Sequence, residues 1–177
     1  MANTYVLISS TTLNSTTGTV TFSSIPSTYT DLVLRASARV STSAGSEVGE
    51  AYFNNTSGNG NYSNTFLRGS GSAALSSRNS ANSTRWDLNA VYDDAGNTAN
   101  TFTNLEWYIA NYTSSLNKSS SWFSVQENNS SAAFLLVEAL YWSNTSAINS
   151  VSVRPQNFGS FGFVSGSSFY LYGIKNS

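Results

Sequence analysis

The sequence predicts an all-β protein in which two antiparallel sheets pack as a β-sandwich. About eleven short segments either alternate apolar with polar residues or are rich in aromatic and β-branched residues, as strands are. Clusters of Gly, Asn, Asp and Ser separate these segments at regular spacing. No segment shows the 3.6-residue period of an amphipathic helix. The chain has 177 residues and no break in composition, so we expect residues 1–177 to form a single domain.

Alternation defines the strands expected in the first half of the chain. The segment 31–40 has the clearest pattern, with Leu32 and Leu34 on one face and Arg35 and Arg39 on the other. Residues 69–83 are mostly small and polar, and we expect them to form a surface loop or an arm that orders on a neighbour. The other strands expected in this half are 4–10, 18–23, 48–53 and 62–68.

In the second half, the segments 85–92 and 101–109 alternate around Trp86 and Trp107. We expect a hairpin turn between them at Asp93-Asp94-Ala95-Gly96-Asn97. A later segment, 132–142, is apolar on both faces except at Glu138, which needs a partner if it is buried. The other strands expected here are 121–126 and 147–154.

The last strand, 166–174, carries large side chains on both faces. Phe169 and Leu171 point to one side, and Tyr170, Tyr172 and Ile174 point to the other. Unpaired aromatic strand edges aggregate, so we expect this strand to lie inside a sheet or at an interface between subunits. The alternative is an edge strand with one solvent-facing tyrosine side.

Charged residues are scarce and hydroxyl and amide residues are abundant. Charged residues make up 10% of the chain, and the net charge is −1; ordinary domains have about 25% charged residues. There are 35 Ser, 18 Thr and 21 Asn.

No basic run is present, which argues against a nucleic-acid partner, and no apolar run reaches the about 20 residues of a membrane span. No signal peptide is expected at the first ten residues, and the weak net charge favours association with other protein.

The residue types that most enzymes use are absent. There is no His and no Cys, which excludes imidazole bases, thiolate nucleophiles and the metal sites that depend on them. No phosphate-binding glycine loop is present. A glycosidase would need two carboxylates in one cleft, and no spacing singles out such a pair, so we expect neither catalysis nor a cofactor. The carboxylates considered are Glu47, Glu50, Asp87, Glu106 and Glu138.

Two weaker binding signals remain in the sequence. Asp93, Asp94 and Asn97 offer the oxygen ligands that Ca²⁺ prefers, but a turn of this composition needs no metal, and we expect none. The four tryptophans could form a platform on which sugars stack. Alternation places two of them in the core, which leaves Trp122 as the candidate for ligand contact.

Short motifs are spread over nearly the whole chain. They are Phe22-Ser-Ser-Ile-Pro26, Tyr29 with Asp31-Leu-Val-Leu-Arg35, Tyr62-Ser-Asn64 with Leu67-Arg68-Gly69, Ile109-Ala-Asn-Tyr-Thr113 with Asn117-Lys118, Glu127-Asn-Asn129, Trp142-Ser-Asn-Thr145 with Ile148, and Gly166-Ser-Ser-Phe169 with Leu171-Tyr-Gly-Ile174. Together they resemble the motifs of small virion proteins of tailed bacteriophages, particularly those of marine cyanobacterial phages. The resemblance implies a sandwich of jelly-roll type and a structural component of the virion, assembled in the host cytoplasm.

The resemblance implies one of two places on the particle. A head decoration or cement protein would bind the major capsid protein and stabilise the shell, as a homotrimer by analogy with the family. A tail-fibre or receptor-binding tip would instead contact host polysaccharide. A single compact domain, the lack of a heptad or collagen-like shaft and a neutral surface favour decoration. A third class, a soluble carbohydrate-binding module, would show exposed coplanar aromatic residues on one sheet face.

Five residues are candidates for an interface with other protein chains. Tyr170, Tyr172 and Ile174 share one face of the last strand, and Arg35 and Arg39 share one face of the segment 31–40. The two tyrosines could instead belong to the core, and for the two arginines the solvated face of a strand is the commoner role.

Overall fold

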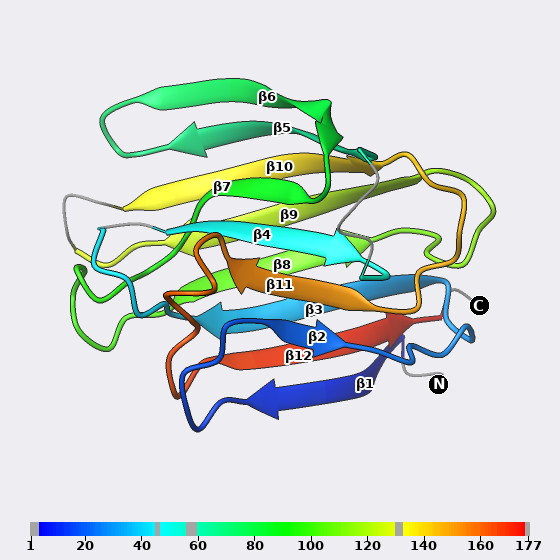
Figure 1. Ribbon diagram of the computed structural model, residues 1–177, viewed down its shortest axis with the longest axis horizontal. Helices are drawn as coiled ribbons and strands as arrows, with labels where there is room; N and C mark the ends of the chain where they lie inside the picture. Colours follow the sequence, from blue (N-terminus) through cyan, green and yellow to red (C-terminus); the bar gives the residue numbers. More distant parts are fainter. Residues whose placement is uncertain (1–3, 45–46, 56–59, 130–132, 176–177) are drawn as a thin grey trace.

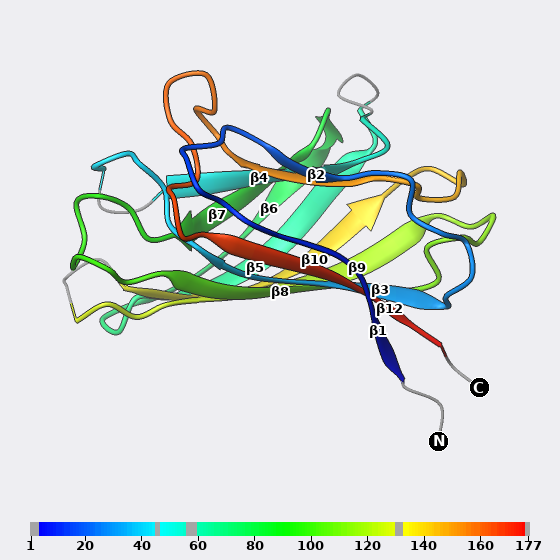
Figure 2. The ribbon, with the colours of Figure 1, turned by 90° about the horizontal axis from the view of Figure 1, so that it is seen from below.

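The computed structural model describes residues 4–44, 47–55, 60–129 and 133–175, and these residues form twelve strands and no helix. An eight-stranded and a four-stranded antiparallel sheet form the two layers of a sandwich (Figures 1 and 2). The predicted antiparallel β-sandwich is therefore confirmed. Nowhere in the described ranges is there a helix long and apolar enough to span a membrane.

The eight-stranded sheet has the order β1-β12-β3-β8-β9-β10-β5-β6, and the four-stranded sheet has the order β2-β11-β4-β7. The strands of the larger sheet are β1 (Tyr5–Thr12), β3 (Asp31–Ala38), β5 (Tyr62–Gly69), β6 (Ala74–Ser83), β8 (Thr103–Ile109), β9 (Lys118–Gln126), β10 (Phe134–Trp142) and β12 (Ser168–Ile174). Those of the smaller sheet are β2 (Val20–Phe22), β4 (Glu47–Phe53), β7 (Trp86–Tyr92) and β11 (Val151–Pro155).

Strands from the two halves of the chain pair in a nested order. The first strand, β1, pairs with the last, β12, and β2 pairs with β11. In the same way β3 lies between β12 and β8, and β4 lies between β11 and β7. Two hairpins, β5–β6 and β9–β10, interrupt this order and pair with each other through β5 and β10. These two hairpins form half of the larger sheet, on the open side of β8.

Phe53 of β4 lies at the centre of the core between the two sheets. Its ring stacks on Trp107 of β8 with ring centroids 5.0 Å apart, and it meets Trp86 and Trp142 edge-on at 4.9 Å and 5.3 Å. All four side chains are at most 1% exposed. Because Phe53 and Trp86 come from the smaller sheet and the other two come from the larger sheet, this cluster holds the layers together.

The last strand lies inside the larger sheet, between β1 and β3, which confirms the interior position expected for residues 166–174. Phe169 and Leu171 face the core and are fully buried. On the other face Tyr170 is 36% exposed and Tyr172 is partly buried, its ring edge-on to Tyr5 with centroids 6.3 Å apart. The tyrosine side of an interior strand is therefore partly in solvent.

Two expectations about local structure are wrong. Most of the expected loop 69–83 is the edge strand β6, which pairs only with β5 and keeps most of its described side chains in solvent, so that no apolar alternation marks it. Asp93–Asn97 is not a hairpin turn, because it joins β7 of the smaller sheet to β8 of the larger one. The strand expected at 121–126 is present as part of β9, which begins earlier, at Lys118. The expected strand start at Ala132 and parts of two expected loops, residues 45–46 and 56–59, lie outside the described residues.

Replacing Phe53 by Ala should lower the free energy of unfolding by about 3–5 kcal/mol, because it removes the ring that contacts tryptophans from both sheets. Urea denaturation measures this change. Phe123→Ala is the control, because Phe123 is 44% exposed, and it should cost about 1 kcal/mol or less. Equal losses in the two variants would contradict the central position of Phe53.

Candidate functional site

The face of the larger sheet that points away from the smaller sheet, here called the outer face, carries exposed apolar side chains. In β10, apolar side chains alternate between the two faces of the sheet. Leu136 and Leu140 point inward and are buried. Leu135, Val137 and Tyr141 point outward and are 50%, 46% and 41% exposed. The sequence predicts apolar residues on both faces of this strand, and the structure shows that only the inner side is covered. Exposed apolar surface of this kind marks contact sites.

Register places several of these side chains next to one another. Leu67 of β5, Val137 of β10 and Phe123 of β9 are directly paired across three neighbouring strands. Leu135 lies two residues further along β10, on the same face. We call Leu67, Phe123, Leu135 and Val137 the apolar patch; their exposed fractions lie between 44% and 55%.

The row that contains Val137 continues across the rest of the sheet with polar and aromatic residues. Glu106 of β8 pairs with Phe123, Arg35 of β3 pairs with Glu106, and Tyr170 of β12 pairs with Arg35. Arg35 Nε donates to Glu106 Oε2 at 2.8 Å, and both side chains are about half exposed. Among the candidate interface residues, Arg35 and Tyr170 are therefore both exposed on the outer face.

Two other candidate interface residues lie inside the chain. Ile174 is 5% exposed and Arg39 is 8% exposed. Arg39 follows the end of β3, and its guanidinium donates to the backbone oxygens of Asn97, Thr98 and Thr101, at 2.8–3.2 Å. The expectation that Arg39 lies on a solvated face is wrong, because this side chain ties down the loop that crosses between the sheets.

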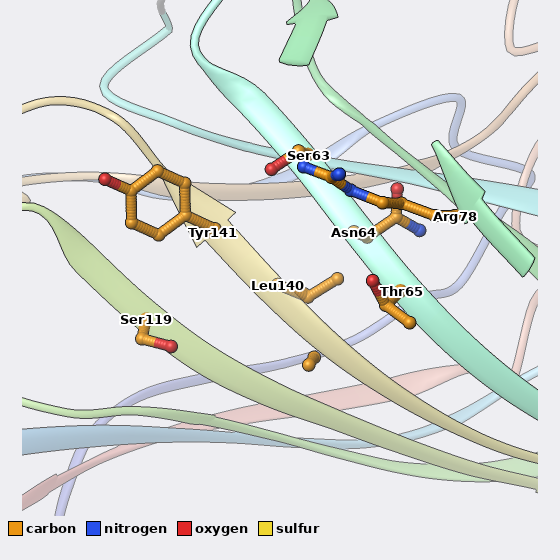
Figure 3. A pocket seen from close by; sticks show the side chains of 8 residues that line it. Ser63, Asn64, Thr65, Arg78, Ser119, Leu140 and Tyr141 are labelled. Atoms are coloured by element: carbon orange, nitrogen blue, oxygen red, sulfur yellow. The ribbon is translucent and has the colours of Figure 1, made fainter. Parts of the chain in front are cut away.

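Beside the apolar patch, the outer face is hollowed by about 420 Å³. Tyr141 of β10 and Arg78 of β6 stand on opposite sides of this hollow, and the Arg78 side chain reaches over β5 towards Ser63 (Figure 3). Small side chains form the floor between them. We call this feature the hydroxyl hollow; its lining residues are Ser63, Asn64, Thr65, Arg78, Ser119, Ala139, Leu140 and Tyr141.

Trp122 is not a surface aromatic. It points inward from β9, is fully buried, and lies 5.7 Å from Trp107 between ring centroids. The strand begins at Lys118, so its inner face runs through residues 118, 120, 122, 124 and 126, and the outward aromatic residue of this strand is Phe123. In this strand serines surround one tryptophan and one phenylalanine, so the sequence pattern does not indicate which of the two rings faces the core.

The carboxylates considered for catalysis are spread over both sheets, each with a structural partner. Glu50 is 1% exposed and receives hydrogen bonds or ion pairs from Arg154 and Arg85, each at 2.6 Å. Asp87 lies 3.5 Å from Arg85, and Glu106 is paired with Arg35. Burial raises the pKa of Glu47, and backbone hydrogen bonds from residues 156 and 157 offset part of this effect. These pairings explain the carboxylates as structural groups.

Glu138 finds the partner that its burial requires. Asn64 Nδ2 donates to its Oε2 at 2.6 Å, and the backbone N–H of Asn89 donates to its Oε1 at 3.0 Å. Burial raises the pKa of Glu138 to about 7 in spite of these two hydrogen bonds, and the nearby charge of Asp87 adds to the rise. The carboxyl joins β10, β5 and β7 beneath the hydroxyl hollow.

Asp93 and Asp94 each have one carboxylate oxygen hydrogen-bonded within the protein, while the Oδ2 atom of each is buried without a hydrogen-bond partner among the described residues. Asp93 Oδ1 accepts hydrogen bonds from the side-chain amides of Asn97 and Asn128, and Asp94 Oδ1 accepts one from the backbone N–H of Gly96 at 2.8 Å. Within the part of the chain that the structure describes, no group of three or more acidic residues is placed to hold a metal ion. This loop therefore gives no independent support for a calcium site.

Comparison of the chain with protein-family models, with curated proteins and with solved structures returns no match. Several residues of the short motifs found in the sequence meet in a structural cluster. Tyr112 donates from its hydroxyl to the backbone oxygen of Pro26, and Asp31 accepts from Tyr108 Oη at 2.7 Å and from the backbone N–H of Asn111 at 2.8 Å. The bond to Asp31 raises the pKa of Tyr108 to about 12. This cluster stabilises the fold, whereas other motif residues, among them Arg35, Ser63 and Leu67, lie on the outer face, which is the candidate functional site.

The buried Glu138 should make stability depend on pH. Its pKa rises from the ordinary 4.5 to about 7, so the folded chain holds this proton more tightly than the unfolded chain does. The stabilisation is complete below pH 4.5 and is lost as the pH rises through 7. We expect the free energy of unfolding to fall between pH 5 and 8, with about 3 kcal/mol of the fall from Glu138.

Urea denaturation at several pH values measures this fall. Glu138→Gln should reduce the fall in the free energy of unfolding. Part of the fall should remain, because the pKa of Glu47 is raised in the same direction. Glu127→Gln is the matched control at an exposed carboxylate and should leave the fall unchanged. A Glu138→Gln variant with the full pH dependence would show that another group is responsible.

Proposed function

We propose that this chain is a structural protein of a tailed-phage virion, a head decoration or cement protein that acts by binding and not by catalysis. It would bind the major capsid protein through the outer face of its larger sheet and assemble as a homotrimer. The observation that carries the proposal is the apolar patch, which lies in register on an open sheet face of a protein with few charges.

The strand order supports the proposal. We infer that the sandwich is a jelly roll with two inserted hairpins, because removal of β5, β6, β9 and β10 leaves the nested orders β1-β12-β3-β8 and β2-β11-β4-β7. Jelly rolls are common among viral capsid domains and lectins. A fold by itself does not define a function, so this support is one of analogy.

The size of the apolar patch argues for an oligomer. Full burial of one such side chain contributes about 2 kcal/mol, so covering four half-exposed ones contributes about 4 kcal/mol. Association costs at least about 4 kcal/mol in lost freedom of motion. One patch would therefore hold a single copy weakly, whereas a symmetric oligomer presents several patches to a repeating shell and gains through effective concentration. Contacts made only in the assembled state then stabilise the shell by mass action.

The location of the protein on the particle tests the proposal. Immunogold labelling of intact virions should place it regularly over the head. Signal confined to the tail would overturn the decoration role in favour of a tail-fibre or receptor-binding tip, and the lack of signal on any particle would overturn the virion role itself.

Val137→Asp tests the apolar patch in the same system, because a carboxylate buried without a partner opposes docking. We expect the purified variant to remain folded and to lose its incorporation into particles. Leu116→Asp is the matched control, since Leu116 is 69% exposed in the loop between β8 and β9. Normal incorporation of Val137→Asp, or equal loss in both variants, would count against the patch.

Tyr170 is the best-placed candidate for contacts between subunits, because it is exposed beside the pair of Arg35 and Glu106. Tyr170→Ser should leave a folded chain and weaken self-association roughly tenfold or more, as loss of an aromatic anchor does. Light scattering over a range of concentrations measures the assembly. An unfolded product would identify Tyr170 as a core residue, and an unchanged oligomer would remove it from the interface.

A further inference from the structure

We propose that the hydroxyl hollow binds an acidic glycan, with Arg78 paired to a sugar carboxylate and Tyr141 stacked against a sugar ring. This site shares no residue with the apolar patch but adjoins it, because Thr65 and Ala139 of its lining lie two residues from Leu67 and Val137. Tyr141 lies four residues from Val137 on the same face of β10, which corresponds to about 13 Å along the strand. The proposal does not rest on the proposed function: it concerns the isolated chain, in which the outer face is open, and a capsid docked on that face would cover the hollow.

The shape of the hollow follows from the size of its side chains. Two rows cross the outer face here, Ser119–Tyr141–Ser63 and Ser121–Ala139–Thr65–Arg78. The side chains between the ring and the guanidinium end at Cβ or one atom beyond it, because they are Ala, Ser and Thr. Asn64 and Leu140 line the hollow only from below, because their side chains are buried on the inner face. A shallow trough is left on an open sheet face.

The lining offers the chemistry that recognises a sugar. Ser63, Thr65 and Ser119 present hydroxyl groups, which both donate and accept hydrogen bonds as sugar hydroxyls do. Tyr141 is 41% exposed and places a flat apolar ring with a polar tip at one side. Convergent polar groups beside an apolar surface are the usual composition of a small-molecule binding site.

Arg78 gives the hollow its preference for an acidic ligand. Its side chain is exposed, and no hydrogen bond or ion pair joins the guanidinium to another residue of the described part of the chain. None of the eight lining residues carries a carboxylate. A free guanidinium binds carboxylates in a bidentate manner, so a uronic acid unit complements it in charge and geometry.

The surroundings argue against a nucleic acid as the occupant. Nucleic-acid binding requires several basic residues that neutralise successive phosphates. Arg78 is the one basic residue that lines the hollow, and Arg35, on the same outer face, is already paired with Glu106. A single cation matches one carboxylate among neutral hydroxyls, as in a uronate-containing polysaccharide.

Titration calorimetry of the purified protein tests the site with two uronate probes, a hexagalacturonate and a hexamannuronate, and with maltohexaose as the neutral counterpart. We expect a uronate probe to bind more tightly than maltohexaose and its binding to weaken as salt is raised, because an ion pair at an exposed site is screened. Failure of both uronates to bind at millimolar concentration, or equal binding of maltohexaose, would overturn the proposal.

Variants then assign the contacts. Arg78→Gln should weaken uronate binding about tenfold or more, as the loss of a charge-assisted hydrogen bond does. Tyr141→Ser should weaken the uronates and any residual maltohexaose binding alike. Arg35→Gln and Tyr170→Ser are matched controls on the same face and should bind normally. Unchanged binding in Arg78→Gln would overturn the assignment, and the salt dependence of the unaltered chain tests the ion pair without any variant.

Discussion

The stacking of Phe53 between tryptophans of both sheets is the contact on which the rest of the structure depends. A sandwich is stable only if its two inner faces share one dry core. Here the smaller sheet has only four strands, so few residues can reach across to the larger one. Phe53 contacts Trp107 and Trp142 of the larger sheet, and Tyr62 of that sheet lies 4.7 Å from Trp86 of the smaller one. With two sheets fixed by aromatic rings inside, the outer face of the larger sheet needs no cover from this chain and stays open.

The open face is built mainly by the two hairpins that interrupt the nested strand order. The apolar patch lies on β5, β9 and β10, and the hydroxyl hollow lies on these three strands and β6. The nested strands, by contrast, provide most of the core and the structural cluster around Asp31 and Tyr112. Functional surface added to a stable scaffold is a common arrangement, because the scaffold carries the stability and the additions are free to vary in composition. The short motifs of the sequence fall on both parts, since Asp31 and Tyr112 belong to the scaffold and Ser63 and Leu67 belong to the open face.

Most of the strands can be predicted from the sequence, but several of the side chains and surfaces that the strands expose or bury cannot. Alternation correctly places Leu34, Ala36 and Trp107 in the core, because a half-buried strand must keep its apolar residues on one side. It fails for β6, where an edge strand with exposed side chains has no apolar pattern to detect, and for Trp122, where a run of serines leaves the phase of β9 undefined. It also fails for Arg39, whose partners are backbone oxygens from a loop about 60 residues away in the chain. The hollow itself could not be found from the sequence, since its two rows combine residues from four strands that only the tertiary pairing brings together.

The interior beneath the hydroxyl hollow differs from the aromatic core and explains how the hollow keeps its shape. Asn64 and Glu138 are hydrogen-bonded on the inner face of β5 and β10, and Asn64 and Asn79 both donate to the backbone oxygen of Asp87 on β7. Apolar side chains tolerate small shifts of one strand along another, whereas a buried carboxyl that loses its amide partner is left uncompensated at a cost of several kcal/mol. This polar network therefore opposes any slip of β5 against β10 or β6. Because a slip by one residue would send Ser63 and Thr65 to the inner face, the hydrogen bonds of Asn64 inside the sheet fix the positions of the groups that line the hollow outside it.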